Sequence, residues 1–210
     1  MKENFKKYLV EFIGTFFLVF TVGSAVVLGA ESLVAAFAIG FALMIMVYAG
    51  GYISGGHYNP AVSLAALLAG ALDKKELVPY WISQIVGAMA ASLLVYGLMD
   101  TSVECTSLFP LSKIIIGEFL FTFALCYVVL QTAVAKGNAG NQYYGLAIGS
   151  TVTVGAFAVG GILCYAAFNP AVALSLGVLN VHCWESIAAT ILANLIGALV
   201  AAYTHKIINK

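Results

Sequence analysis

Two asparagine–proline pairs supply the residue types in this chain that could orient a small polar molecule. The tetrapeptide Asn-Pro-Ala-Val occurs at 59–62 and again at 169–172, each time inside an apolar stretch. Asparagine is a preferred N-cap, and proline suits the first helical position, where its missing N–H costs nothing. Each copy therefore predicts a short helix with the positive end of its dipole at the asparagine. The motif residues are Asn59, Pro60, Ala61, Asn169, Pro170 and Ala171.

The side chains of the two asparagines are suited to hold an oxygen atom. An N-capping asparagine accepts a backbone N–H with its oxygen, which leaves both N–H groups of its amide free. If two such amides donate to one water in a single file, both hydrogens of that water point toward its neighbours. The continuous chain of hydrogen-bonded waters that could relay a proton is then interrupted. Two helix N-termini at the same point also repel cations. The pattern predicts a passage for neutral molecules where Asn59 and Asn169 meet.

The composition indicates an integral membrane protein. The 210 residues are 62% hydrophobic with a mean hydropathy of +1.02, and 9% are charged, against about 25% in soluble domains. A spanning helix needs about 20 residues. The pieces at 60–70 and 170–179 are too short to cross, so the sequence predicts an all-α fold of six transmembrane helices and two re-entrant half-helices. The six expected spans are 8–30, 33–52, 77–99, 111–134, 143–163 and 184–205.

The lysines predict the orientation in the membrane. Six spans put eight of the nine lysines on the side of both termini and only Lys113 on the other side. The positive-inside rule then predicts cytoplasmic N- and C-termini in a cell membrane. A basic start and an apolar run also fit a signal peptide, but the run is long enough to span and contains Glu11, which has a counterpart in the second half.

The chain repeats internally. An offset of 110 residues superimposes the two tetrapeptides, and an offset of 107 places Glu11 on Glu118. We expect one membrane channel domain over 1–210, with repeats at about 8–99 and 111–205 and a linker at about 100–110. Each repeat holds three full spans, so the second is inverted relative to the first. Inverted repeats place their functional site at the membrane midplane.

The segments that lead into the half-helices must be non-helical, and their carbonyls need partners inside lipid. Lining an aqueous passage meets that need and makes Gly55, Gly56 and His57 candidate lining residues, although His57 also suits a structural role. Glu11 and Glu118 are the acids away from the ends of the expected spans, where an unpaired charge costs about 3 kcal/mol or more. They suit either proton-coupled transport or, as their matching positions favour, structural support of the re-entrant backbone in their own half.

Taken together, the motifs resemble those of the aquaporin (major intrinsic protein) family over nearly the whole chain. The resemblance rests on the doubled Asn-Pro-Ala, Ser-Gly-Gly-His at 54–57, Glu-Phe-x-Gly-Thr-Phe at 11–16 and the paired Glu118. It implies a right-handed bundle, a homotetramer with one pore in each subunit, and passive conduction of water and small neutral solutes across the lipid bilayer. It implies no cofactor, no metal and no nucleic-acid partner.

The family's outer constriction is formed by four positions. The spacing from the two motifs carries them to Ile39, Phe157, Ala166 and Val172. Most members have an arginine at the last position, whereas this chain has Val172 and contains no arginine. An apolar ring neither donates hydrogen bonds nor adds a positive barrier. We expect it to slow water relative to arginine-bearing relatives and to penalise weakly polar neutral molecules less, with Phe157 setting the width.

Water is the expected permeant, and glycerol, ammonia, peroxide or a dissolved gas is the alternative within the same fold. A secondary transporter or a structural membrane protein is the alternative of another class, although a transporter would need coupling groups at the midplane besides the asparagines. An enzyme is disfavoured, because no nucleophile, base and orienting group fall together. The four cysteines show no metal-ligand spacing, and Cys164 and Cys183 could form a disulfide outside the membrane.

Overall fold

The chain folds into a bundle of helices, which the computed structural model describes over residues 3–98, 110–160 and 166–210. Five of the helices are long. They are α1 (Glu3–Val27), α2 (Ser32–Ser54), α4 (Lys74–Leu98), α5 (Leu111–Val129) and α9 (Trp184–Ile208). The shorter elements are α3 (Pro60–Ala69), α6 (Tyr144–Gly155), α8 (Pro170–Val178), the π-helical turns η1 (Leu130–Val134) and η3 (Ala156–Gly160), and the 3₁₀ turn η2 (Lys136–Asn138).

The predicted fold class is confirmed. Five helices are long and apolar enough to cross a membrane. The sixth expected span, at 143–163, is α6 together with η3 as far as Gly160, and its last residues lie outside the described part of the chain. The two expected half-helices are α3 and α8, each beginning at the proline of its motif. Within residues 3–98, 110–160 and 166–210 the regular elements are all helical.

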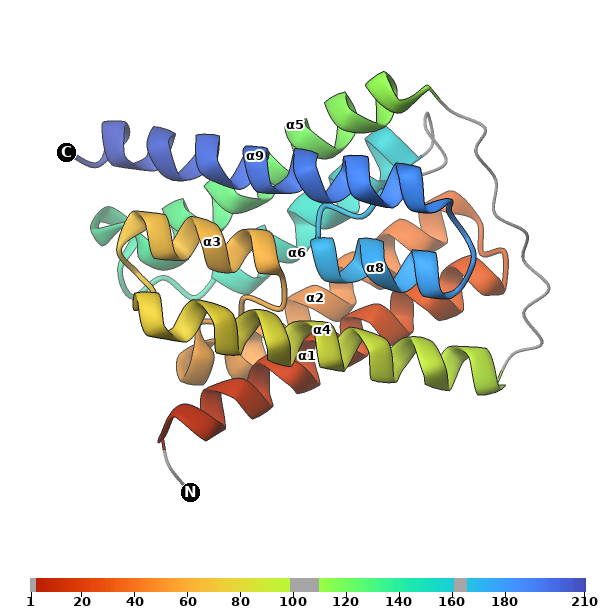
Figure 1. Ribbon diagram of the computed structural model, residues 1–210. Coiled ribbons are helices and arrows are strands. Elements are labelled where there is room, and N and C mark those ends of the chain that lie inside the picture. Colours follow the sequence, from red (N-terminus) through yellow and green to blue (C-terminus); the bar gives the residue numbers. More distant parts are fainter. Residues whose placement is uncertain (1–2, 99–109, 161–165) are drawn as a thin grey trace.

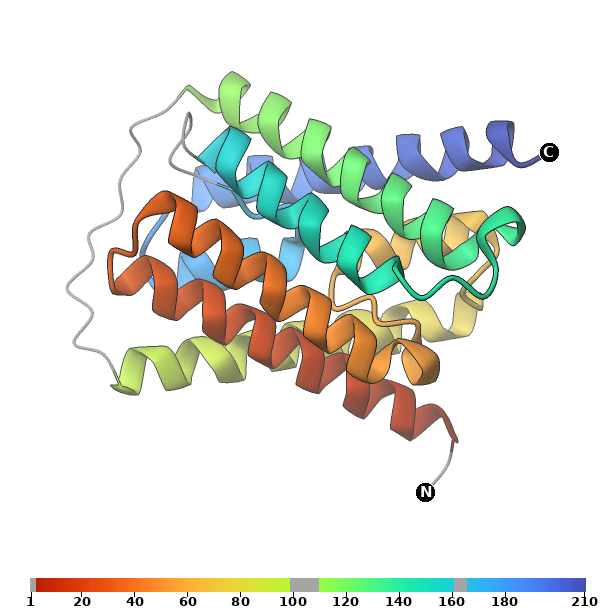
Figure 2. The same ribbon diagram turned by 180° about the vertical axis from the view of Figure 1, so that it is seen from behind.

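The half-helices α3 and α8 meet in the middle of the bundle. Figure 1 shows them between α4 and α9, with the beginning of each facing the beginning of the other. The ten residues of α3 extend for about 15 Å, which is about half of the hydrocarbon core of a bilayer. On the other face, α1, α2, α6 and α5 lie side by side (Figure 2). The start of α1 and the end of α9 lie at the same end of the bundle.

Local capping explains why the two half-helices begin where they do. The side-chain oxygen of Asn59 accepts the backbone N–H of Ala61 at 2.8 Å, and that of Asn169 accepts the N–H of Ala171 at 2.9 Å. Both asparagines have extended backbone, and a proline follows each at the first helical position. At the other end of α3, Gly70 has a φ of 82° and its N–H bonds the carbonyls of the last turn. Such a left-handed stop favours glycine.

Glycines let the long helices approach until their backbones touch. Gly87 of α4 lies against α1, where an added Cβ would stand 2.5 Å from the carbonyl oxygen of Phe12. Gly197 of α9 lies against α5 in the same way, with 2.9 Å to the carbonyl oxygen of Phe119. Lipid gives apolar helices little reason to associate, so packing at this distance is a main source of attraction between them.

We expect Gly87→Ala to lower the melting temperature of the detergent-solubilised protein. The backbone of Phe12 cannot give way, so α1 and α4 must separate, and overpacking of this kind costs about 1–3 kcal/mol. Gly97→Ala in the same helix is the matched control, because nothing lies within 4 Å of its added Cβ. Alanine there should leave stability unchanged or raise it. Equal melting temperatures of the two variants, followed by circular dichroism, would contradict this account.

Candidate functional site

Hydrogen bonds cross between the two half-helix starts. The amide nitrogen of Asn59 donates to the carbonyl oxygen of Phe168 at 2.8 Å, and the amide nitrogen of Asn169 donates to the carbonyl oxygen of Tyr58 at 2.9 Å. The expectation that both N–H groups of each amide are free is therefore wrong, because the carbonyl opposite takes one of them. Each asparagine keeps one further N–H. The reciprocal pair ties the two re-entrant loops together at the centre of the bundle.

The residue before each asparagine has an unusual backbone conformation. Tyr58 has a φ of 49° and Phe168 a φ of 50°, a left-handed conformation that bulky residues rarely adopt. Both residues are buried, with 1% and 2% of their surface exposed. The hydroxyl of Tyr58 donates to the carbonyl of Met46 at 2.9 Å, and the ring of Phe168 packs on that of Phe121. This conformation aims each carbonyl at the asparagine of the other half.

Glu11 holds the first loop from α1. Its Oε1 accepts the hydroxyl of Ser54 at 2.7 Å and the N–H of His57 at 2.9 Å. Its Oε2 accepts the N–H of Tyr58 at 2.7 Å and the amide of Gln84 at 2.8 Å. The side chain is fully buried. Four donors surround the carboxyl group, so the group is engaged in holding backbone and is not presented to a passing ion.

Glu118 holds the second loop from α5 with the same pattern. Its Oε1 accepts the N–H of Ala167 at 2.7 Å, and its Oε2 accepts the N–H of Phe168 and the amide of Asn194, both at 2.8 Å. Glu118 is also fully buried. Gln84 and Asn194, which the sequence reasoning missed, are thus equivalent supports in α4 and α9. A signal was present, since they are polar residues 110 apart within apolar spans.

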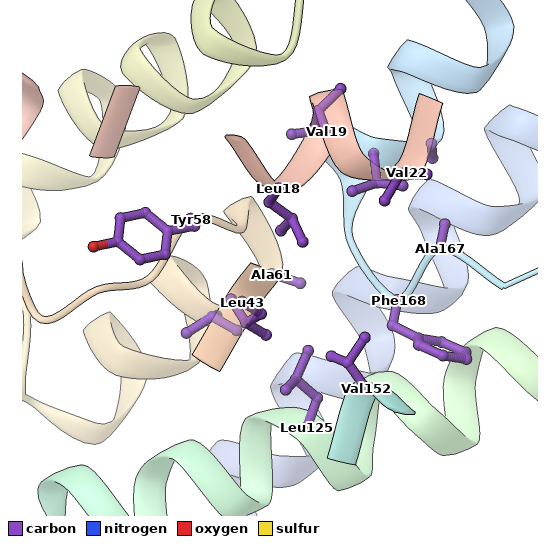
Figure 3. Packing of buried hydrophobic residues seen from close by; sticks show 14 of the residues in the cluster. Leu18, Val19, Val22, Leu43, Tyr58, Ala61, Leu125, Val152, Ala167 and Phe168 are labelled. Atoms are coloured by element: carbon purple, nitrogen blue, oxygen red, sulfur yellow. The ribbon is translucent and has the colours of Figure 1, made fainter. Parts of the chain in front are cut away.

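Asn59 and Asn169 line one shared cavity that runs between the long helices. Its wall is polar where the two loops pass and apolar opposite them. Figure 3 shows the apolar side, where Leu18, Leu43, Leu125 and Val152 converge from α1, α2, α5 and α6. The centre of a water molecule can occupy a volume of ≈ 30 Å³ in this cavity. One water needs about 10–15 Å³ by that measure, so the space suits a short single file.

The glycines and the histidine of the first loop lie at different places. Gly56 and His57 line the narrow cavity. His57 is buried and its Nδ1 lies 3.1 Å from the hydroxyl of Ser63, so it is both a lining residue and a fixed one. Gly55, with a φ of 92°, instead lines a wider hollow of ≈ 320 Å³ beside the turn around Asn138.

Three of the four expected constriction residues line the cavity and one does not. Ile39, Ala166 and Val172 lie on its wall, and Val172 is 3% exposed. Phe157 is 57% exposed on the outside of the bundle, and Ala156 lines the cavity instead. The cause is the π-helical turn at η3. Such a turn holds one residue more than an α-helical turn, so a count carried back across it from Asn169 stops one residue short, at Phe157 instead of Ala156.

The described cysteines differ in their bonding state. Cys183 is disulfide-bonded, and its expected partner Cys164 lies outside the described residues. Cys126 is free and buried within α5. Among the residues that the structure describes, no three His, Cys, Asp or Glu side chains are placed to hold a metal ion.

Comparisons of the sequence with known proteins agree on one family. The model of the family described as Major intrinsic protein matches residues 1–205. A glycerol uptake facilitator protein-like 6 of Lactiplantibacillus plantarum is 39% identical over 96% of this chain and 97% of its own length. Aquaporin Z of Brucella melitensis is 48% identical over 43% of this chain and 42% of its own length. The aquaglyceroporin structure from Plasmodium falciparum superimposes with a TM-score of 0.77 at 21% identity, covering 98% and 97% of the two chains.

We expect Glu118→Gln to destabilise the protein and to lower its yield as a folded species. Glutamine would put an NH₂ group against a backbone N–H, and each buried donor left without a partner costs about 1–3 kcal/mol. Glu185→Gln is the control, since Glu185 is exposed in the first turn of α9. Thermal unfolding in detergent measures both. A melting temperature of Glu118→Gln within a degree of Glu185→Gln would refute the supporting role.

Proposed function

The chain belongs to the major intrinsic protein family and is a channel rather than an enzyme, and we propose that it passively conducts water and small neutral solutes while excluding ions and protons. The observation that carries this proposal is the single cavity lined by both Asn59 and Asn169. Each asparagine keeps one amide N–H after its bond to the opposite loop. These two donors are available to the oxygen of a molecule in single file.

The same geometry supports exclusion of charge. The N-termini of α3 and α8 face one another at this point, and their dipoles add positive potential there. A water that accepts from both amides must direct its hydrogens toward its neighbours, which interrupts a proton wire. Cations meet an unfavourable potential, and any ion would lose its hydration shell to a largely apolar wall. Neutral molecules with an acceptor oxygen or nitrogen pay neither cost.

We assign the outer constriction to Ile39, Ala156, Ala166 and Val172. All four line the cavity, and all four side chains are aliphatic. None of these four side chains donates a hydrogen bond in place of the arginine that is common at the last position in the family. Water loses more hydrogen bonding in such a ring than a molecule with an apolar body does, so selectivity shifts toward weakly polar solutes.

Small neutral solutes other than water are therefore the second candidate. Ala156 contributes one methyl group to the ring where a phenyl group was expected, which leaves more width. A full-length relative is named as a glycerol uptake facilitator-like protein. These two observations favour glycerol-like molecules, with ammonia, peroxide and dissolved gases in the same class of uncharged permeants.

We further propose that the chain consists of two inverted repeats, at about 8–99 and 111–205. The matching roles of Glu11 and Glu118 and of the two asparagines support this reading. With a cytoplasmic N-terminus in the cell membrane, the C-terminus is cytoplasmic too, since α1 begins and α9 ends at the same end. The family resemblance implies a homotetramer. The exposed phenylalanines of α2, Phe37 and Phe41, offer an apolar surface to lipid or to a neighbouring subunit.

A coupled transporter accounts less well for these residues. Such a protein needs an acid that can take up and release an ion in the course of transport. The buried carboxyl groups of Glu11 and Glu118 are occupied by four and three donors, respectively, from their own halves. Passive conduction requires no such group.

Proteoliposomes test the proposed activity. We expect the protein to raise water permeability above that of empty vesicles and to pass glycerol or ammonia without ionic current, as followed by stopped-flow light scattering and by conductance. Val172→Arg should lower the permeability to glycerol at least several-fold relative to water, because it adds bulk and charge at the ring. If no neutral solute crossed faster than in empty vesicles, the channel proposal would fall. If the variant matched the wild type for every solute, Val172 would not set selectivity.

The assignment of Ala156 is tested against its neighbour. We expect Ala156→Phe to narrow the ring and reduce glycerol permeability by an order of magnitude or more. Phe157→Ala should leave it within twofold of wild type, because Phe157 lies on the outside of the bundle. The same swelling assay compares the two. A larger loss from Phe157→Ala than from Ala156→Phe would return Phe157 to the constriction.

A further inference from the structure

A groove on the outside of the bundle has the shape and charge of a lipid site. It lies between α3 and α9, and its volume is ≈ 220 Å³. The wall consists of Leu68 from α3 and of Leu199, Ala202, Tyr203 and Lys206 from α9. The four α9 residues are spaced i, i+3, i+4 and i+7, so they form one stripe along the helix. The groove is separate from the conducting cavity, with which it shares no lining residue.

The groove runs in the direction of an acyl chain. From Leu199 to Lys206 the helix rises by about 10 Å, which is about a third of a hydrocarbon core. Leu199 and Tyr203 are 47% and 69% exposed, so the groove opens away from the bundle. At the end of α9, Lys206 places its ammonium near the level of the headgroups, two residues before the helix ends at Ile208.

The charge of this end of the bundle selects the occupant. Lys206 is the charged residue of the groove, and Lys210 follows it one turn later at the end of the chain. Two acids near the same end of the bundle lie outside the groove. Asp73 accepts the backbone N–H of Lys75 at 3.0 Å, and Glu76 lies against the hydroxyl of Tyr8. No carboxylate lines the groove beside Lys206, so the phosphodiester of an anionic lipid would supply the negative charge that pairs with it.

We propose that the groove between α3 and α9 binds an anionic phospholipid, with an acyl chain along Leu68, Leu199 and Tyr203 and the phosphate on Lys206. The lipid would cover the outer side of α3, the half-helix that Asn59 caps. Binding depends on Lys206 for the preference for charge and on the α9 stripe for the chain. Neither depends on the identity of the permeant.

Native mass spectrometry of the full-length protein tests the site, with phosphatidylglycerol and phosphatidylcholine of the same acyl chains as probes. We expect wild type to retain phosphatidylglycerol at least threefold better than phosphatidylcholine, and Lys206→Gln to abolish this preference. Lys75→Gln, at the same end of the bundle but outside the groove, should retain it. Absence of any preference in wild type, or an equal loss in Lys75→Gln, would overturn the proposal in favour of general surface attraction.

A matched pair of variants tests the part of the groove that would hold the acyl chain. Leu199→Trp should fill the groove and lower phosphatidylglycerol retention at least threefold with the charge unchanged. Leu192→Trp lies two turns earlier on the same face of α9, is 59% exposed in the wild type, and should have no effect. Equal retention by the two variants would contradict an acyl-chain seat. A changed subunit number in Leu199→Trp, read from the same spectra, would instead identify the groove as a contact between copies of the chain.

Discussion

The structure depends on pairing backbone groups where lipid offers no water. The two loops that lead into α3 and α8 leave the helical hydrogen-bond pattern in the middle of the bundle, and every N–H released there must find a partner. Glu11 and Glu118 meet this demand from neighbouring long helices, with oxygens 2.7–2.9 Å from the backbone nitrogens. Once those N–H groups are held, the carbonyls of the same loops are free to turn toward the cavity and toward the opposite asparagine.

Position and selectivity are therefore set by different parts of the molecule. The buried carboxyl groups and the reciprocal asparagine bonds fix where the loops lie, and neither Glu11 nor Glu118 lines the cavity. The side chains that we propose as the outer constriction are aliphatic and make no hydrogen bonds of their own. Under the proposed function, a side-chain change at this ring alters selectivity while leaving the loops in place, whereas a change of Glu11 removes bonds that hold the backbone itself.

Much of the fold and part of the site could be predicted from the sequence, because they rest on local rules. Asparagine before proline specifies where a helix begins, and the apolar runs specify the spans. Ala156 could not be found this way, since the π-helical turn that exposes Phe157 has no clear mark in the residues of η3. The bonds from the asparagine amides to Phe168 and Tyr58 were also missed. They depend on two left-handed residues 110 positions apart, and neither is a glycine.

The reciprocal asparagine bonds have a consequence for biogenesis. A ribosome delivers Tyr58 and Asn59 to the bilayer more than a hundred residues before Phe168 and Asn169. Until then, one carbonyl and one amide of the first loop lack the partners that they have in the finished protein. The loop before α3 thus completes its hydrogen bonds only when the loop before α8 is in place. The conducting path, whose wall comes from both halves of the chain, can therefore be completed only after the second half has been inserted.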